Sequence, residues 1–408
     1  MDKKIYLDNN ATTSVHPEVR EAMLPYLGEI FGNPSSVHAF GQLARKAVED
    51  SREKLAALIG AKTPEEVVFT SCGTEANNFA LKGLAWQLKD KGNQIITSAI
   101  EHHAVLIPCQ YLEKQGFKIT YLPVNRWGEV DLEVLKKEIT AQTILISIMH
   151  ANNEIGTIQP IESIAQIAHE QKILFHTDAV QTVGKLPIDV EKMGIDLLSL
   201  SAHKFYGPKG AGALYIRRGI KLNALLHGGH HERNRRAGTE NVSGVVGMAV
   251  AAELAVKNSL EENKRLVYLR NKLERGILEK ISHVRLNGHP ENRLSNTANF
   301  VFEFIEGEGL VLSLDFEGIA LSTGSACTSG TLEPSHVLKA IGVPAEISQG
   351  SLRFSLGYYN TEEDVDYVLQ TIPRLVNRLR EMSPLWEDKL KGITTKYADD
   401  KHQHEKEE

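Results

Sequence analysis

The middle of the chain alternates short, continuously apolar runs with longer segments in which apolar residues recur at helical spacing. The apolar runs predict strands over residues 66–70, 94–99, 143–149, 173–176, 196–200 and 212–216. The amphipathic segments predict helices over residues 75–89, 104–115 and 161–171. Continuous apolar strands separated by helices are typical of a parallel sheet that helices cover on both faces. Ligands of such sheets bind beyond the carboxyl ends of the strands, so polar residues that follow strands are the first functional candidates.

The pattern changes in the last third of the chain. Residues 242–281 predict one long helix, or two consecutive helices, that links two domains. Predicted strands over residues 297–304 and 351–356 then alternate with helical segments such as 361–380. We therefore predict a large domain over residues 15–255 and a smaller α+β domain built from residues 1–14 and 256–390. The highly charged C-terminus predicts a disordered tail over residues 391–408.

Composition narrows the class of protein. With 408 residues and 42% hydrophobic residues, the chain is too apolar to be disordered and long enough for about two domains. It has 46 Lys and Arg against 52 Asp and Glu, a net charge of −6, which argues against binding to nucleic acid or an anionic membrane. It shows no signal-peptide core and no long apolar run typical of a membrane span. The odd count of three cysteines predicts an unpaired thiol and favours a reducing, cytoplasmic location.

Two polar segments follow predicted strands in the first half of the chain. In residues 70–75 (TSCGTE), Gly73 allows close backbone approach and Thr74 adds a hydroxyl at a helix start, a combination that favours a phosphate. Simple N-capping by Ser71 or Thr74 explains the same residues equally well. Asp178 directly follows another strand, and its carboxylate either caps a following helix or serves a ligand.

Two further segments carry a lysine and a cysteine in unusual surroundings. Lys204 lies just past a buried strand, between His203 and a Gly-rich stretch, where a lysine can act as a Schiff-base amine. The alternative is an exposed loop lysine. Cys327 lies in a small, polar, Gly- and Ser-rich loop, where its thiolate is a candidate nucleophile. The alternative is an incidental surface thiol. Cys109, within a helical pattern, is expected to fill the core.

These parts together fit one cofactor better than any other. Pyridoxal phosphate needs a Schiff-base lysine, a carboxylate at its pyridinium nitrogen and a cradle for its phosphate. Lys204, Asp178 and the turn at Gly73 and Thr74 supply these three groups from the ends of predicted strands. The sequence therefore predicts a pyridoxal-phosphate enzyme.

Many ordered segments also resemble a known family. They are YLDNNATT (6–13), GNPSSVH (32–38), TSCGTEANN (70–78), EHHAV (101–105), HANNEIG (150–156), HTDAVQ (176–181), SAHKFYGPKG (201–210), GGHHERNRRAGTEN (228–241), GSACTSG (324–330), LEPSHVL (332–338) and LRFSLG (352–357). With these segments, which cover nearly the whole chain, it resembles the NifS/IscS-type cysteine desulfurases of the class-V aminotransferase family. The resemblance implies an α/β fold of type I among pyridoxal-phosphate-dependent transferases. In that fold, a mostly parallel seven-stranded sheet forms the large domain beside a smaller α+β domain.

The resemblance also implies how the cofactor is held. The cofactor-binding residues would be Gly73, Thr74, Asn153, Asp178, Gln181, Ser201, His203, Lys204 and Thr239. Asp178 would pair with the pyridine nitrogen, Gln181 would hydrogen-bond the ring oxygen, and His102 would stack on the ring and shuttle protons. Thr239 would reach the phosphate held by the partner subunit, which implies a homodimer.

The chemistry implied by the resemblance is desulfuration of L-cysteine to L-alanine. Arg353 would clamp the substrate carboxylate with a planar guanidinium, assisted by Asn33. Lys204 would remove the Cα proton. The Cys327 thiolate would attack the substrate sulfur and keep it as a persulfide, with His102 as its proton acceptor. The partners would be an iron–sulfur scaffold protein or another sulfur acceptor, toward which Cys327 could also serve as a shared, transient ligand of a cluster.

Several alternatives stay open at this stage. The chain lacks the R-x-G-H-H-C-A signature of a second branch, which includes selenocysteine lyases. Residues 330–336 and 383–386 look more like NifS, which suggests nitrogenase maturation, than like a housekeeping enzyme of general cluster assembly. A selenocysteine lyase, or another pyridoxal-phosphate enzyme of the same fold, would keep Lys204 and Asp178 without needing Cys327. A sulfur-carrier or cluster-binding scaffold protein would need Cys327 alone.

Overall fold

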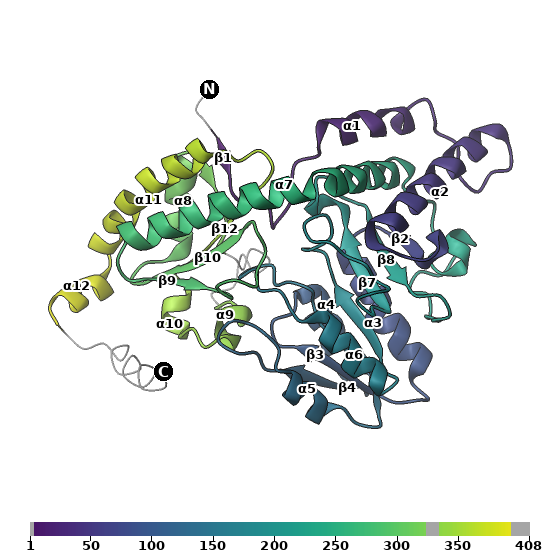
Figure 1. The fold of residues 1–408 in the computed structure, drawn as a ribbon, viewed down its shortest axis with the longest axis horizontal. Coiled ribbons are helices and arrows are strands. Elements are labelled where there is room, and N and C mark those ends of the chain that lie inside the picture. The colour runs from purple at the N-terminus through teal and green to yellow at the C-terminus, as the bar shows by residue number, and fades with distance from the viewer. Residues whose placement is uncertain (1–3, 324–333, 393–408) are drawn as a thin grey trace.

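The computed structural model describes residues 4–323 and 334–392 (Figure 1). Two predictions lie outside the described residues. One is the candidate nucleophile Cys327, with the loop around it, and the other is nearly all of the C-terminal tail.

A seven-stranded sheet forms the centre of the larger part of the molecule. Its order is β2 (Val67–Thr70), β8 (Gly212–Ile216), β7 (Leu197–Ser201), β6 (Leu174–Asp178), β5 (Thr143–Ser147), β3 (Gln94–Ser98) and β4 (Lys118–Leu122). All neighbours run parallel except β8, which is antiparallel to both β7 and β2. The predicted mostly parallel sheet of seven strands is confirmed. Its strands are buried on both faces, as their continuous apolar sequences require, apart from the edge strand β4.

Helices cover both faces of this sheet (Figure 1). On one face, α3 (Gly73–Leu88) and α4 (His103–Glu113) pack in a core with Val68 and Leu214. On the other face, α2 (Ala39–Ile59) and α6 (Ile161–Glu170) pack in a core with Val67 and Phe69. Because side chains alternate along a strand, neighbouring residues of β2 enter different cores. The remaining elements of this part are α1 (Pro17–Met23), α5 (Leu132–Glu138), η1 (Leu24–Leu27), η2 (Pro64–Glu66), η3 (Ala202–Lys204) and η4 (His231–Asn234).

A second, antiparallel sheet has the order β12 (Ser351–Ser355), β10 (Thr297–Phe302) and β9 (Val284–Asn287). A separate parallel pair joins β1 (Ile5–Tyr6) near the N-terminus to β11 (Ile319–Ala320). Helices α8 (Gly307–Phe316) and α11 (Glu362–Glu381) pack with these strands around a core of their own. Three short helices complete this part, α9 (His336–Ala340), α10 (Ala345–Ser348) and α12 (Pro384–Leu390).

One helix, α7, connects the two sheets and their cores (Figure 1). It runs unbroken over the 39 residues Val242–Lys280. Its N-terminal half packs on α1 and α2, and its C-terminal half packs on α11 and the second sheet. The helical link is thus present, while the domain boundaries near residues 14 and 255 stay a prediction. Within the described chain, no helix combines the length and apolar character needed to cross a membrane.

Candidate active site

The start of α3 lies against the ends of β6 and β7, and Gly73 makes this contact possible. A Cβ atom on Gly73 would lie 2.6 Å from Cγ2 of Val180 and 3.5 Å from Cβ of Ser201. Carbon atoms do not approach to 2.6 Å without displacement, so only glycine fits here. The close approach brings backbone N–H groups of the helix start next to the polar residues that end two strands.

Hydroxyl groups surround this helix start. Ser201 Oγ is buried and has no hydrogen-bond partner among the described residues. Thr74 is exposed, and its hydroxyl has no hydrogen bond to any described residue. The N-cap is Cys72, whose Sγ accepts a hydrogen bond from the Glu75 N–H at 3.4 Å, so capping by Ser71 or Thr74 is not observed. Unused hydroxyls beside a helix N-terminus are the donors that an anion such as phosphate requires.

Asp178 ends β6 as a buried carboxylate. Its Oδ2 accepts a hydrogen bond from Asn77 Nδ2 at 2.6 Å, and its Oδ1 accepts one from the Val180 N–H at 3.0 Å. No helix follows β6, so the alternative of a helix cap is wrong. Burial raises the pKa of Asp178, while its two hydrogen bonds and the nearby Lys204 act in the opposite direction. A buried carboxylate of this kind gains from a cationic partner such as a protonated ring nitrogen.

Lys204 ends η3 and points toward the N-terminal segment. Its Nζ donates hydrogen bonds to the carbonyl oxygens of Asn10 at 2.5 Å and Ala11 at 2.8 Å. Gln181 Nε2 donates to the same carbonyl of Asn10 at 2.9 Å. The alternative of an exposed loop lysine is therefore wrong, because the amine is turned into the protein and bonded there.

Asn10 is a buried residue that hydrogen-bonds to several residues of this site, and the sequence analysis did not single it out. Besides Lys204 and Gln181, its amide Nδ2 donates to Thr297 Oγ1 at 2.8 Å and to the carbonyl of Asn153 at 3.2 Å. It thereby links a loop beside β5, the end of β6 and the second sheet. The available signal was its place in the segment YLDNNATT, three residues after the short apolar run that ends at Leu7.

Two histidines flank Lys204. His102 is the N-cap of α4, and its Nδ1 accepts a hydrogen bond from the Ala104 N–H at 3.0 Å. Burial, followed by the positive charges of Lys204 and other groups, lowers the pKa of His102 to about 4. Burial and Lys204 also lower the pKa of His203 to about 4, and its Nδ1 lies 3.1 Å from Thr12 Oγ1. Both imidazoles are therefore neutral near pH 7.

Arg353 reaches the site from β12. Its Nη2 lies 2.7 Å from Oδ1 of Asp8, and its Nη1 donates to the carbonyl of Asn153 at 3.1 Å. Its backbone N–H donates to the carbonyl of Ser322 at 2.7 Å, close in sequence to Cys327. The structure thus brings Arg353 and Asn153 together, and Asn10 connects both to Lys204.

Two predicted site residues lie elsewhere. Asn33 is exposed, its Oδ1 accepts a hydrogen bond from the Ser35 N–H, and its loop projects far from β12 in Figure 1. Thr239 is also exposed, in the loop after η4. The preceding η4 is anchored by a buried ion pair in which Nη1 and Nη2 of Arg52 contact Glu232, at 2.7 and 2.8 Å. Within one chain, neither Asn33 nor Thr239 joins the other site residues.

A buried acid, Glu101, is a further feature that sequence reasoning missed. Its Oε1 accepts hydrogen bonds from Ser98 Oγ at 2.6 Å and from the Met149 N–H at 2.9 Å. Burial raises the pKa of Glu101 to about 8, despite these bonds. Its neighbours His102 and His103 in the segment EHHAV were the only signal. Across residues 4–323 and 334–392, no group of three or more acidic, His or Cys side chains forms a candidate metal site.

Cys109 is buried in α4 and packs in the core with Leu145, as predicted. Burial raises the pKa of its thiol well above the usual range. Cys109 is therefore an inert core residue.

Comparisons with known proteins identify the family and several relatives of the chain. The model of the family described as Aminotransferase class-V matches residues 5–368. The cysteine desulfurase IscS of Dictyoglomus turgidum is 58% identical over 384 residues, which are 94% of this chain and 97% of that protein. A solved structure described as a NifS-like protein is 44% identical with a TM-score of 0.87, and covers 92% of this chain and 100% of its own. Another, described as SspA in complex with cysteine, is 39% identical with a TM-score of 0.78, and covers 88% of this chain and 100% of its own.

Proposed function

The chain belongs to the class-V aminotransferase family and is a cysteine desulfurase, and from this premise we propose that it binds pyridoxal phosphate between Lys204, Asp178 and Ser201. The observation that carries the proposal is the convergence of these groups. Lys204 and Gln181 meet at the carbonyl of Asn10, while Asp178 is bonded to α3, whose N-terminus lies beside Ser201.

The donor and acceptor groups fit this cofactor. The buried Ser201 hydroxyl without a partner, the exposed Thr74 hydroxyl and the N-terminus of α3 suit its phosphate, with His203 nearby. The buried carboxylate of Asp178 suits its protonated ring nitrogen, and the Gln181 amide suits its ring oxygen. When bound, the cofactor supplies a ring that stabilises negative charge at the substrate Cα.

Residues of the chain then handle the substrate and its protons. Arg353 binds the carboxylate of L-cysteine with its guanidinium, beside the carbonyl of Asn153. The Lys204 amine takes the Cα proton, and the carbonyls of Asn10 and Ala11 accept its N–H groups and orient it. His102, neutral near pH 7, would stack on the cofactor ring and would accept the thiol proton of Cys327.

We assign the sulfur transfer to Cys327, which lies outside the described residues. Its thiolate attacks the substrate sulfur and the bond between that sulfur and Cβ breaks. The electron pair of the broken bond stays with the carbon, where a proton completes the methyl group of L-alanine. The sulfur remains on Cys327 as a persulfide until an acceptor takes it. Because this cycle needs a reduced thiol, we place it in the cytoplasm.

A homodimer is part of the proposal. From the end of α1 into the first turns of α2, six large apolar side chains are exposed, and they are Leu24, Leu27, Phe31, Val37, Phe40 and Leu43. Exposed apolar side chains gathered in one segment are typical of a protein–protein interface. A second copy would cover them, and it would give Thr239 and Asn33 an opportunity to complete the partner's site.

The sulfur acceptor is proposed to be an iron–sulfur scaffold protein. This rests on the likeness to a relative named IscS and on the predicted persulfide. Dedicated delivery to nitrogenase, suggested by residues 330–336 and 383–386, stays a prediction, as does a shared cluster ligated by Cys327.

The experiment is to incubate the purified protein with L-cysteine and a reductant and to assay sulfide and alanine together. We expect equal amounts of both products. Lys204→Ala should lose the visible absorbance of the bound cofactor together with both products. Cys327→Ala should keep the absorbance and lose sulfide release. Unchanged sulfide release by Cys327→Ala would refute the persulfide step, and a colourless wild-type protein would refute the cofactor.

A further inference from the structure

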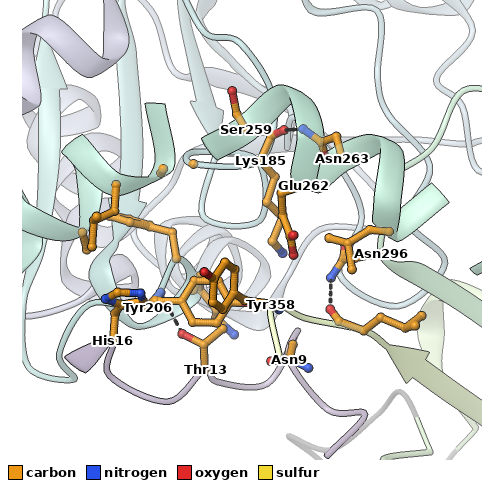
Figure 2. Close-up of a pocket in the computed structure, with 18 residues that line it drawn as sticks. Asn9, Thr13, His16, Lys185, Tyr206, Ser259, Glu262, Asn263, Asn296 and Tyr358 are labelled. Carbon is orange, nitrogen blue, oxygen red and sulfur yellow. Dashed lines mark hydrogen bonds between the residues drawn. The ribbon is translucent and has the colours of Figure 1, made fainter. Parts of the chain in front are cut away.

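A second lysine, Lys185, lies close to Lys204 and has no assigned role. It occupies the loop after β6, and Lys185 and Lys204 line the same cavity of about 70 Å³ beneath α7 (Figure 2). The backbone carbonyl of Lys185 accepts a hydrogen bond from Asn263 Nδ2 of α7 at 2.5 Å. The loop position of Lys185 is therefore fixed by the long helix.

The amine of Lys185 contacts Gln181 and Asn10, and Asn10 also accepts a hydrogen bond from Lys204. Lys185 Nζ lies 3.2 Å from Gln181 Oε1 and 3.4 Å from Asn10 Oδ1. The Gln181 amide is thus bonded at both ends, because its Nε2 donates to the Asn10 carbonyl. If the Gln181 amide were rotated by a half-turn, its N–H groups would face the Lys185 donor and its oxygen would face the Asn10 carbonyl. Lys185 therefore selects the orientation in which Gln181 presents an N–H group to the site.

The charge of Lys185 is not neutralised locally. Within the described parts of the chain, no carboxylate forms an ion pair with its Nζ, and the cations Lys204 and Arg353 lie within electrostatic range. The cavity wall also carries His16, Tyr206, Tyr358 and Glu262, the last paired with Arg265 at 2.7 Å. Burial, followed by repulsion from Lys204 and Arg353, lowers the pKa of Lys185 to about 7, so its positive charge acts on Lys204 at and below neutral pH. A second cation beside an amine favours the neutral, nucleophilic form of that amine.

We propose that Lys185 is a positioning residue for the Schiff-base nitrogen, which it reaches through Asn10 and Gln181. Its ammonium group orients the Gln181 amide toward the ring oxygen, and its charge disfavours a proton on the nitrogen of Lys204. The inference rests on the proposed function, because it assumes that Lys204 carries the cofactor.

The test is a pH titration of the visible absorbance of the holoenzyme. Removing a nearby positive charge stabilises the protonated nitrogen, so Lys185→Met should raise the midpoint by about one pH unit. Lys185→Arg keeps both the charge and the donors and should keep a midpoint close to that of the wild type. Lys192→Met is the matched control, because Lys192 is exposed and pairs with Asp189 on the surface. Its midpoint should not move.

The outcomes separate this inference from the proposed function. A midpoint in Lys185→Met equal to that in Lys192→Met would overturn the role of Lys185, even if the enzyme is active. If Lys185→Met does not fold, Lys185→Gln removes the charge with a smaller change, and an unshifted midpoint there would overturn it equally. Visible absorbance that survives in Lys204→Ala would instead refute the proposed function.

Discussion

The buried Arg353 forms an ion pair with the half-buried Asp8, in which Nη2 lies 2.7 Å from Oδ1. The residue proposed to bind the substrate carboxylate is therefore already held by a carboxylate from the segment after β1. The contact helps to fix the plane of the guanidinium that is proposed to bind the substrate carboxylate. Substrate recognition thus depends on the geometry of the guanidinium as well as on its charge.

Arg353→Lys should raise the KM for L-cysteine at least about tenfold, with a smaller change in kcat, because an ammonium cannot hold two carboxylates in one plane. Steady-state assay of alanine over a range of cysteine concentrations measures both constants. Arg374→Lys is the control, since Arg374 pairs with Glu317 on the surface. Equal KM values in the two variants would contradict the assignment.

Gly73→Ala should lower the free energy of unfolding by about 1–3 kcal/mol and reduce the cofactor content, because the new Cβ meets Cγ2 of Val180 at 2.6 Å. Urea unfolding and the ratio of cofactor to protein measure the two effects. Adding Val180→Ala removes the clashing methyl group and should restore cofactor binding, whereas Val180→Ala alone should keep it. If the double variant binds no more cofactor than Gly73→Ala, the clash is not the cause.

Arg52→Met should destabilise the fold by about 3–5 kcal/mol, because it leaves Glu232 buried without its cation. Thermal unfolding measures the loss. Arg52→Met combined with Glu232→Leu should be more stable than Arg52→Met alone, since no unpaired charge remains. Lys46→Met removes an exposed pair with Asp50 and should change stability by less than about 1 kcal/mol. A comparable loss from both single variants would contradict this account.

The free energy of unfolding should fall as the pH drops from about 6.5 toward 4. Burial lowers the pKa of His176 to about 3 and that of His150 to about 4, so the folded state resists protonation that the unfolded state accepts. Each histidine then contributes up to about 1.4 kcal/mol per pH unit in this range. Urea unfolding at several pH values measures this fall in the free energy of unfolding. His176→Gln should reduce the slope of that free energy against pH. An unchanged slope would show that other groups dominate.

Sequence patterns predicted the strands that are buried on both faces, because continuous apolar runs leave few alternatives. They missed β4, an edge strand whose residues are mostly half-buried, and α2, which packs through small residues such as Ala44 and Ala47. The chemistry of Lys204 and Asp178 could be predicted because both follow strands.

The network around Lys204 could not be predicted in the same way. Asn10 lies in a segment without regular structure, and its partners Gln181, Asn153 and Thr297 are separated from it by more than a hundred residues. Neither local pattern nor propensity encodes contacts over that separation. The predicted helix-capping roles of Asp178 and Thr74 were wrong for a related reason. The surroundings of both residues depend on tertiary contacts of α3, which the local sequence does not encode.

The number of residues in helix α7 determines the spacing of the two sheets. Deleting one residue between its two packed halves would turn the C-terminal half by about 100° and draw it in by about 1.5 Å. The sheet that carries Arg353 would then face away from Lys204, although every residue of the site would still be present. The length of the helix therefore sets the distance and the orientation between the two sheets. Natural variation in this length should be confined to whole helical turns, with compensating changes in other segments. Substitutions along the exposed side of the helix should be tolerated.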